Sequence, residues 1–372
     1  MAENGNSSRF ISADSHIFEP PNLFWDHLAD KWGEKLPRVI HEFKGQKGDF
    51  YYNGSDNEVI ELTSRQRVRD AKLDPRWQEA GTIPELRMLY QQEERVDAEI
   101  LNPTEGLTFL RFESRDMLRD CCQVYNDWLA EYCSYSPQNL IGTAIIPIED
   151  VEWAVGELQR TTAKGLKGAF INVDSPEGFP SYFDSMYDPF WAAAQEIDVP
   201  ISLHIGTGRI RTGLSLLTRE ERMQMPVGGI MSRAEVMWVL ARDFIYGGIL
   251  ERFPGLSILC SEFEISWIPW FMNEMDRNMQ RTWNITYGYT PLKMLPSEYM
   301  KTRVWHGFID DPYVSQLGPI IGIDRLLWGS DFPHPEGIGL KARETLAPIL
   351  SGLSEEDREK VTSTNAAKLW KL

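Results

Sequence analysis

The sequence predicts an α/β fold, a distorted (β/α)8 TIM barrel with a small insertion after its first strand. Short apolar runs alternate with helical segments from Phe10 to the C-terminus, as expected for parallel strands covered on both sides. Eight such runs occur, and eight β/α alternations in one chain indicate a barrel. The alternative is an open doubly wound sheet, but no G-x-G-x-x-G follows the first run.

The predicted strands are short, and several of them stop at residues that break a strand. Pro103 and Pro147 follow the second and third strands, and Gly206-Thr207-Gly208 closes the fifth. The eight strands are predicted at 10–16, 97–102, 140–146, 168–173, 199–205, 256–262, 303–308 and 326–331.

The segments between these strands carry helix-start signals. Pro84 and Pro189 stand in the first turn of two predicted helices, where proline is favoured. Ser354 with Asp357 indicates a helix cap. Helices are predicted at 22–32, 83–95, 114–136, 151–164, 188–197, 230–253, 266–282, 311–321, 341–350 and 354–367.

Residues 37–83 interrupt this alternation. Short β-prone pieces are separated there by glycines, and Phe50-Tyr51-Tyr52 followed by Asn53-Gly54 is a hairpin signal. We expect an insertion over one barrel mouth, where such segments often close active sites. Residues 1–372 would therefore form one domain.

Composition argues against several classes of protein. A net charge of −17 argues against nucleic acid and against anionic membrane surfaces as partners. No apolar run approaches the roughly 18 residues that span a bilayer, and the polar N-terminus does not resemble a signal peptide. The four cysteines form no C-x-x-C pair. Reduced thiols in a cytoplasmic protein are the natural interpretation.

The first strand carries a candidate pair of metal ligands. Asp14 and His16 are two residues apart in FISADSHIFEPP, so they point to the same side of a strand. A carboxylate and an imidazole side by side can bind one metal ion. A helix-capping aspartate beside a surface histidine is the alternative.

Other strand ends add ionisable residues, and in a barrel these ends share one mouth. Of the six histidines in the chain, four fall at strand ends, His16 included. The residues at the other strand ends are His204, Glu262, His306, Asp331 and the nearby His334. We expect Asp14, His16, His204 and Asp331 to bind one divalent ion. Arg209 or Arg211 follows the fifth strand and could pair with a substrate carboxylate.

Four motifs then resemble a known family. FISADSHIFEPP, ISLHIGTG, FPGLSILCSEFEISWIPWFMNEMDR and LLWGSDFPHPEG are similar to the amidohydrolase-related (amidohydrolase 2) branch of the amidohydrolase superfamily. That branch includes aminocarboxymuconate-semialdehyde decarboxylase and aromatic-acid decarboxylases. The resemblance implies a distorted barrel with one metal at its mouth. By it, Asp14, His16, His204 and Asp331 match the metal ligands, and Asp331 also exchanges protons.

The sequence departs from this pattern at two positions. Glu262 stands where the decarboxylases usually carry a catalytic histidine. The fourth strand reads Phe170-Ile171-Asn172, without the metal-binding lysine that two-metal hydrolases carry on that strand. Glu262 can be a general base or a further metal ligand, but it cannot be a cationic acid. A second metal would need Glu262 with His306 or His334. We therefore expect Asp331, Glu262 and His306 to be catalytic, and His334 to bind substrate with the arginines.

These features leave three functions open. The first is a metal-dependent enzyme that decarboxylates or hydrolyses a small carboxylated substrate, with Zn, Mn or Fe as its ion. The second is a dinuclear Fe or Mn monooxygenase in which Glu262 bridges the metals. The third is a supporting barrel subunit of a hetero-oligomeric enzyme. The resemblance otherwise favours a homo-oligomer.

Overall fold

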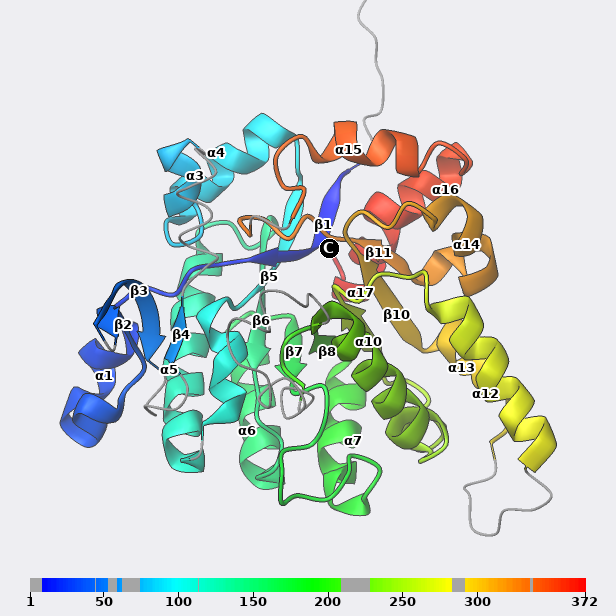
Figure 1. Ribbon diagram of the computed structural model, residues 1–372, viewed down its shortest axis with the longest axis horizontal. Coiled ribbons are helices and arrows are strands. Elements are labelled where there is room, and N and C mark those ends of the chain that lie inside the picture. The colour runs from blue at the N-terminus through cyan, green and yellow to red at the C-terminus, as the bar shows by residue number, and fades with distance from the viewer. Residues whose placement is uncertain are drawn as a thin grey trace, which may run out of the picture.

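Eight parallel strands form a nearly closed barrel surrounded by helices (Figure 1). The computed structural model describes residues 9–43, 45–52, 59–61, 74–112, 114–208, 228–282, 292–334 and 337–372. The barrel strands, in spatial order, are β1 (Ile11–His16), β5 (Ala98–Asn102), β6 (Leu140–Ile145), β7 (Gly168–Ile171), β8 (Ile201–His204), β9 (Ile258–Ser261), β10 (Val304–Phe308) and β11 (Leu326–Trp328). This confirms the predicted (β/α)8 barrel, because spatial order follows chain order.

Helices lie around the barrel, most of them between successive strands (Figure 1). They are α1 (Leu23–Trp32), α3 (Pro75–Glu79), α4 (Pro84–Glu94), α5 (Arg115–Ser134), α6 (Val151–Ala163), α7 (Asp188–Ile197), α10 (Gly228–Val239), α11 (Ile249–Arg252), α12 (Ile268–Thr282), α13 (Pro296–Thr302), α14 (Val314–Ile321), α15 (Ala342–Ile349), α16 (Glu355–Glu359) and α17 (Asn365–Trp370). Within the described residues, none of these helices is both long and apolar enough to cross a membrane.

Two predicted helices are divided in the structure. The segment predicted at 230–253 consists of α10, the π-helical η4 (Leu240–Ile245) and α11. The break before α11 falls at Gly248, whose φ of 79° is a left-handed conformation that favours glycine. The segment predicted at 354–367 is divided by the π-helical η6 (Lys360–Thr364).

The C-terminal helix α17 closes the barrel at the N-terminal ends of the strands. Leu369 and Trp370 pack with Ile11, Ala98 and Leu259 in one buried apolar cluster. This end is therefore a packed core, and the functional site belongs at the opposite end.

Three strands form a separate antiparallel sheet: β2 (Arg38–Phe43), β3 (Gln46–Tyr52) and β4 (Val59–Glu61). Tyr51 packs on Phe109, with ring centroids 6.4 Å apart, and Phe109 lies in η2 (Glu105–Arg111), after β5. The predicted Asn53-Gly54 turn lies outside the described residues. An insertion at 37–83 over the barrel mouth, within a single domain, stays a prediction.

The first and last strands meet at a seam, which we define as residues 12–16 and 329–332. The Asp331 N–H donates to the Asp14 carbonyl at 2.9 Å, and the His16 N–H donates to the Phe332 carbonyl at 2.7 Å. The Ser330 N–H donates to Ser12 Oγ at 2.8 Å. These bonds bring two strands from opposite ends of the chain together at the mouth.

Candidate metal centre

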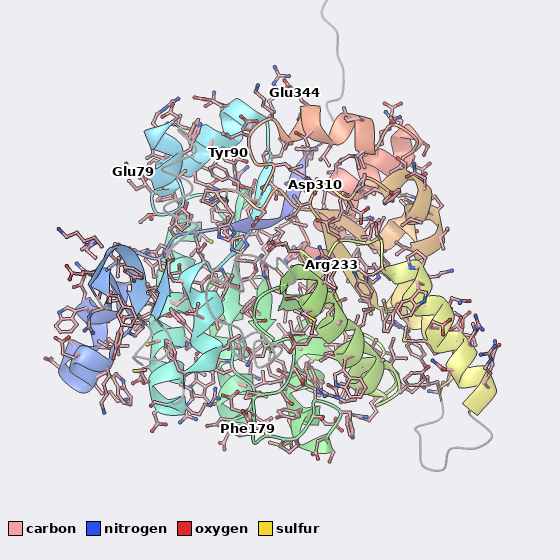
Figure 2. The ribbon with its side chains drawn as sticks, in the orientation of Figure 1. Glu79, Tyr90, Phe179, Arg233, Asp310 and Glu344 are labelled. Carbon is pink, nitrogen blue, oxygen red and sulfur yellow. The ribbon has the colours of Figure 1, made fainter. Side chains whose placement is uncertain are left out.

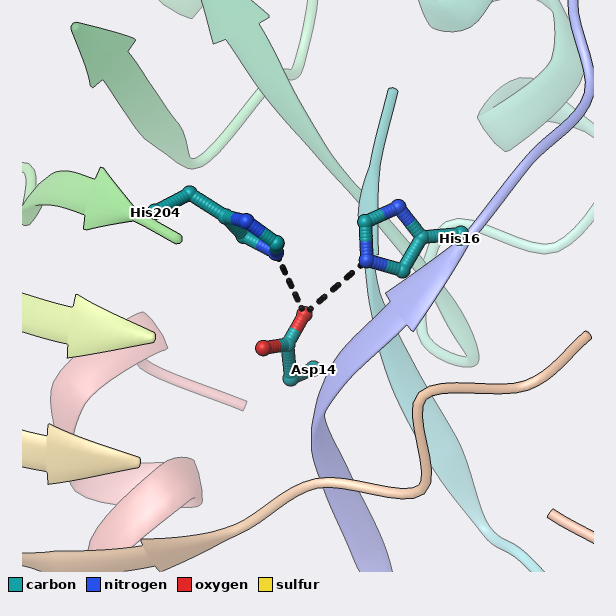
Figure 3. Close-up of side chains that lie close together, drawn as sticks. All are labelled: Asp14, His16 and His204. Carbon is teal, nitrogen blue, oxygen red and sulfur yellow. Dashed lines mark ion pairs between the residues drawn. The ribbon is translucent and has the colours of Figure 1, made fainter. Parts of the chain in front are cut away.

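The carboxyl end of β1 directs Asp14 and His16 into the barrel mouth, where they meet His204 from the end of β8 (Figure 3). Asp14 Oδ1 lies 3.6 Å from His16 Nε2 and 3.4 Å from His204 Nε2. All three residues are buried. Their ligand atoms lie within 4.8 Å of one another, which is close enough to hold one metal ion.

Asp331 joins this cluster from the other side of the seam. Its Oδ1 lies 3.3 Å from His16 Nε2 and 2.9 Å from His334 Nδ1. His16, Asp331 and His334 form a second group with metal-binding spacing. The four residues that the sequence predicted as ligands are thus neighbours, and His334 adjoins them.

The unpartnered atoms of the cluster fit a cation. Asp14 Oδ2, His16 Nε2, His204 Nε2 and Asp331 Oδ2 are buried without a hydrogen-bond partner among the residues that the structure describes. Burying such atoms without a partner is costly. Two carboxylates and two imidazoles form a donor set that suits Mn, Fe or Zn.

Outer contacts set the direction of each imidazole lone pair. His16 Nδ1 donates to the Pro103 carbonyl at 2.6 Å, and His204 Nδ1 donates to the Ile205 carbonyl at 2.9 Å. In the neutral form of each ring, Nε2 is then left as a bare acceptor that faces the cluster, the usual arrangement of metal-binding histidines. The Asn102 amide donates to Asp14 Oδ1 at 2.7 Å and orients that carboxylate.

Burial and neighbouring charges shift the ionisation of the cluster. Burial lowers the pKa of His16, and His334 and His204 add to this effect, so its neutral form is favoured. Burial acts in the same direction on His204, but the nearby Asp14 carboxylate prevails and raises the pKa of His204. Burial also raises the pKa of Asp331, against the attraction of His334.

Glu262 lies at the rim of the cluster, directly after β9. Its Oε2 is 3.6 Å from His204 Nε2, and its side chain is 20% exposed. Glu262 and Asp331 have φ angles of 66° and 55°, which are uncommon for residues other than glycine. Such strain often concentrates at functional sites.

The structure separates His306 from the other predicted site residues. Trp305 packs in the interior cluster against α17, and the side chain of His306 points to the opposite side of β10. His306 Nε2 donates to the Met300 carbonyl in α13 at 3.1 Å. This position corrects the expected catalytic role, because an outward-facing side chain cannot reach the mouth.

Of the three residues expected to bind substrate, only His334 lies within the described residues. The His334 ring stacks on His16 with centroids 4.0 Å apart, and its Nε2 lies 3.0 Å from Thr104 Oγ1. His334 therefore contacts the ligand cluster directly, and its expected role in substrate binding stays a prediction. Arg209 and Arg211 lie outside the described residues.

Asn102 is a site residue that the sequence reasoning missed. It is the last residue of β5, and Pro103 follows it. The sequence could have indicated Asn102, because it is a polar residue at the end of a predicted barrel strand and such ends face the mouth.

Comparison with known proteins decides the family. A profile described as "Amidohydrolase" matches residues 22–372. The chain belongs to the amidohydrolase family. This confirms the resemblance that the four motifs indicated.

One curated relative is similar to the chain in sequence, and two solved structures are similar to it in fold. The chain is 27% identical to a gamma-resorcylate decarboxylase of Rhodococcus jostii over 78% of its own length and 88% of the relative. An amidohydrolase of Mycobacterium avium subsp. paratuberculosis shares the fold, with a TM-score of 0.79, 20% identity and coverage of 98% and 99% of the two chains. A dihydroxybenzoic acid decarboxylase of Polaromonas sp., solved with manganese and 2-nitroresorcinol, has a TM-score of 0.66, 21% identity and coverage of 98% and 97%.

Proposed function

We propose that this amidohydrolase-family chain is a metal-dependent decarboxylase of a small aromatic carboxylate. The observation that carries this proposal is the buried set of unpartnered ligand atoms on Asp14, His16, His204 and Asp331. The relative from Rhodococcus jostii is a decarboxylase, and the Polaromonas decarboxylase was solved with manganese. Decarboxylation is therefore favoured over hydrolysis, which the residues alone left open.

Asp14, His16, His204 and Asp331 would hold one divalent ion, with manganese the first ion to test. When bound, the ion supplies positive charge that attracts substrate oxygens and neutralises the two buried carboxylates. Zinc or iron would suit the same donors. Glu262 would add at most a further ligand at the rim, because its Oε2 lies 3.6 Å from His204 Nε2.

The reaction needs a proton but no oxidant. The bond between the ring carbon and the carboxyl carbon breaks, its electron pair stays on the ring carbon, and CO2 leaves. A proton then bonds to that carbon. Asp331 is buried, with its Oδ1 3.3 Å from His16 Nε2, and Glu262 lies at the rim, with its Oε2 3.6 Å from His204 Nε2. We assign the proton transfer to these two carboxyl groups, since general acid–base transfer contributes substantially to such rates.

A chelation experiment tests the proposal. Purified protein is treated with EDTA, reloaded with Mn, Zn or Fe, and assayed for CO2 release from hydroxylated benzoates. We expect turnover that disappears with EDTA and returns with one of the ions. Ester, amide and thioester hydrolysis is measured in parallel. Hydrolysis without CO2 release would overturn the assignment, and so would the absence of metal-restored CO2 release.

The two alternatives are less well supported. The Rhodococcus jostii relative and the Polaromonas protein are decarboxylases, so they do not favour a dinuclear oxygen-activating site. A supporting subunit would be inactive alone and would copurify with a second barrel chain. A homo-oligomer stays a prediction, which light scattering of the purified protein would test.

A further inference from the structure

A buried arginine contacts both sides of the seam from outside the barrel. Arg87 lies on α4 and is fully buried. Its Nη1 donates to the His16 carbonyl at 2.7 Å, and its Nη2 donates to the Phe332 carbonyl at 3.3 Å. The first carbonyl belongs to a proposed metal ligand. The second belongs to the residue after another ligand, Asp331.

Glu99 holds this guanidinium in place. Arg87 Nε donates to Glu99 Oε2 at 2.6 Å, and Nη2 donates to Glu99 Oε1 at 2.9 Å. Gln91 also donates to Glu99 Oε2, at 2.9 Å. Two parallel bonds of this kind fix the plane of the guanidinium group as well as its position.

Aromatic rings hold the same group from one side. The guanidinium carbon lies 4.8 Å from the centre of the Phe332 ring. Tyr90, which is labelled near α4 in Figure 2, is fully buried and stacks on Phe332 with centroids 3.6 Å apart. Phe332 is therefore held both by its carbonyl and by its ring, next to Asp331.

We propose that Arg87 is a positioning residue that holds the two seam segments together and so sets the spacing of His16 and Asp331. The metal-binding part of this inference rests on the proposed function. Partners outside the ligand shell typically change metal affinity by about ten- to hundredfold when they are lost. Arg87 differs from an ordinary structural ion pair because its donors reach the backbone of both ligand-bearing segments.

The geometry requires arginine specifically. A guanidinium has five donors in a rigid plane, whereas a lysine ammonium is a compact charge on a flexible stem. Arg87→Lys keeps the positive charge beside Glu99 but cannot span Glu99 and two carbonyls at once. This variant therefore separates the charge of Arg87 from its bridging role.

The test compares Arg87→Lys with a matched control, Asn365→Ala. Asn365 is also buried, and its amide donates to the Ile323 and Leu326 carbonyls at 2.7 and 2.9 Å. Its contacts lie at the start of β11, away from the mouth. Mn2+ affinity is measured by titration, thermal stability by melting, and seam opening by amide hydrogen exchange of metal-free protein.

We expect Arg87→Lys to bind Mn2+ about tenfold more weakly than the parent. The amide hydrogens of His16 and Asp331 should exchange with solvent faster in this variant. Asn365→Ala should lower the melting temperature but leave seam exchange and Mn2+ affinity unchanged. If Arg87→Lys does not fold, Glu99→Gln removes the charge that orients the guanidinium and tests the same relationship.

Unchanged exchange at the His16 and Asp331 amides of Arg87→Lys would overturn the proposal. Unchanged Mn2+ affinity would do the same when the parent binds Mn2+. If the parent binds no metal, the proposed function fails, whereas hydrogen exchange in metal-free protein still decides whether Arg87 holds the seam.

Discussion

His16 Nε2 lies 3.3 Å from Asp331 Oδ1, across the seam where the first and last barrel strands meet. Both atoms are buried. An imidazole lone pair and a carboxylate oxygen at this distance leave two electron-rich atoms facing each other unless a proton or a cation lies nearby. This relationship is the physical reason to expect a metal at the seam.

Asp331→Asn should weaken Mn2+ binding by about ten- to hundredfold and abolish CO2 release, because the amide removes a ligand charge and a proton-transfer group. The metal-free variant should be at least as stable as the metal-free parent, since burial raises the pKa of Asp331 and disfavours its ionised form in the fold. Titration, turnover and melting check these outcomes. Asp324→Asn is the control, because that side chain is 71% exposed. Tight Mn2+ binding by Asp331→Asn would argue against this ligand.

His204→Gln and Glu262→Gln should lose different properties, the first its Mn2+ binding and the second its turnover rate. His204→Gln removes a buried ligand and should lose Mn2+ binding. Glu262→Gln should lower kcat by about a hundredfold while it retains the ion, because Glu262 lies at the rim with a 20% exposed side chain. Metal content by elemental analysis, set beside kcat, separates the two. Loss of the ion in both variants would make Glu262 a ligand.

Gly329→Ala should disrupt the seam. A Cβ at Gly329 would lie 2.4 Å from Asp14 Cβ and 3.0 Å from Asp14 N. We expect the variant to lose about 1–3 kcal/mol of unfolding free energy and to bind Mn2+ more weakly. Gly156 in α6 has nothing within 4 Å of an added Cβ, so Gly156→Ala should gain about 0.5–1 kcal/mol. Urea denaturation measures both, and equal stability of the two variants would contradict the close approach.

Acid should destabilise the protein through His306. Burial lowers the pKa of His306 from 6.5 to about 4. Between pH 6.5 and pH 4, His306 binds a proton in the unfolded chain but not in the folded chain. The free energy of unfolding therefore falls as the pH falls from 6.5 towards 4. This group contributes at most about 3 kcal/mol of that loss. His306→Gln should make the unfolding free energy less dependent on pH in this range.

His27→Gln is the control for this measurement, because His27 is exposed on α1. It should leave the pH dependence as in the parent. Denaturant unfolding at several pH values measures both variants. An unchanged slope in His306→Gln would show that its burial does not control acid stability.

Local periodicity allowed much of this architecture to be predicted. Eight apolar runs between helical segments specify the barrel, because each strand is buried on both faces. The two-residue spacing of Asp14 and His16 puts both side chains on one face of β1. The barrel rule then brings His204 and Asp331 to the same mouth.

Only the tertiary structure decided which of the residues near the strand ends belong to the metal centre. His306 lies on a correctly predicted strand, but side chains alternate, and the residue position alone does not give the direction in which each one points. Arg87 lies on a correctly predicted helix, yet its contacts with the His16 and Phe332 carbonyls join segments far apart in the chain. Sequence patterns report periodicity within one element, whereas the seam depends on the packing of several elements, which no local pattern contains.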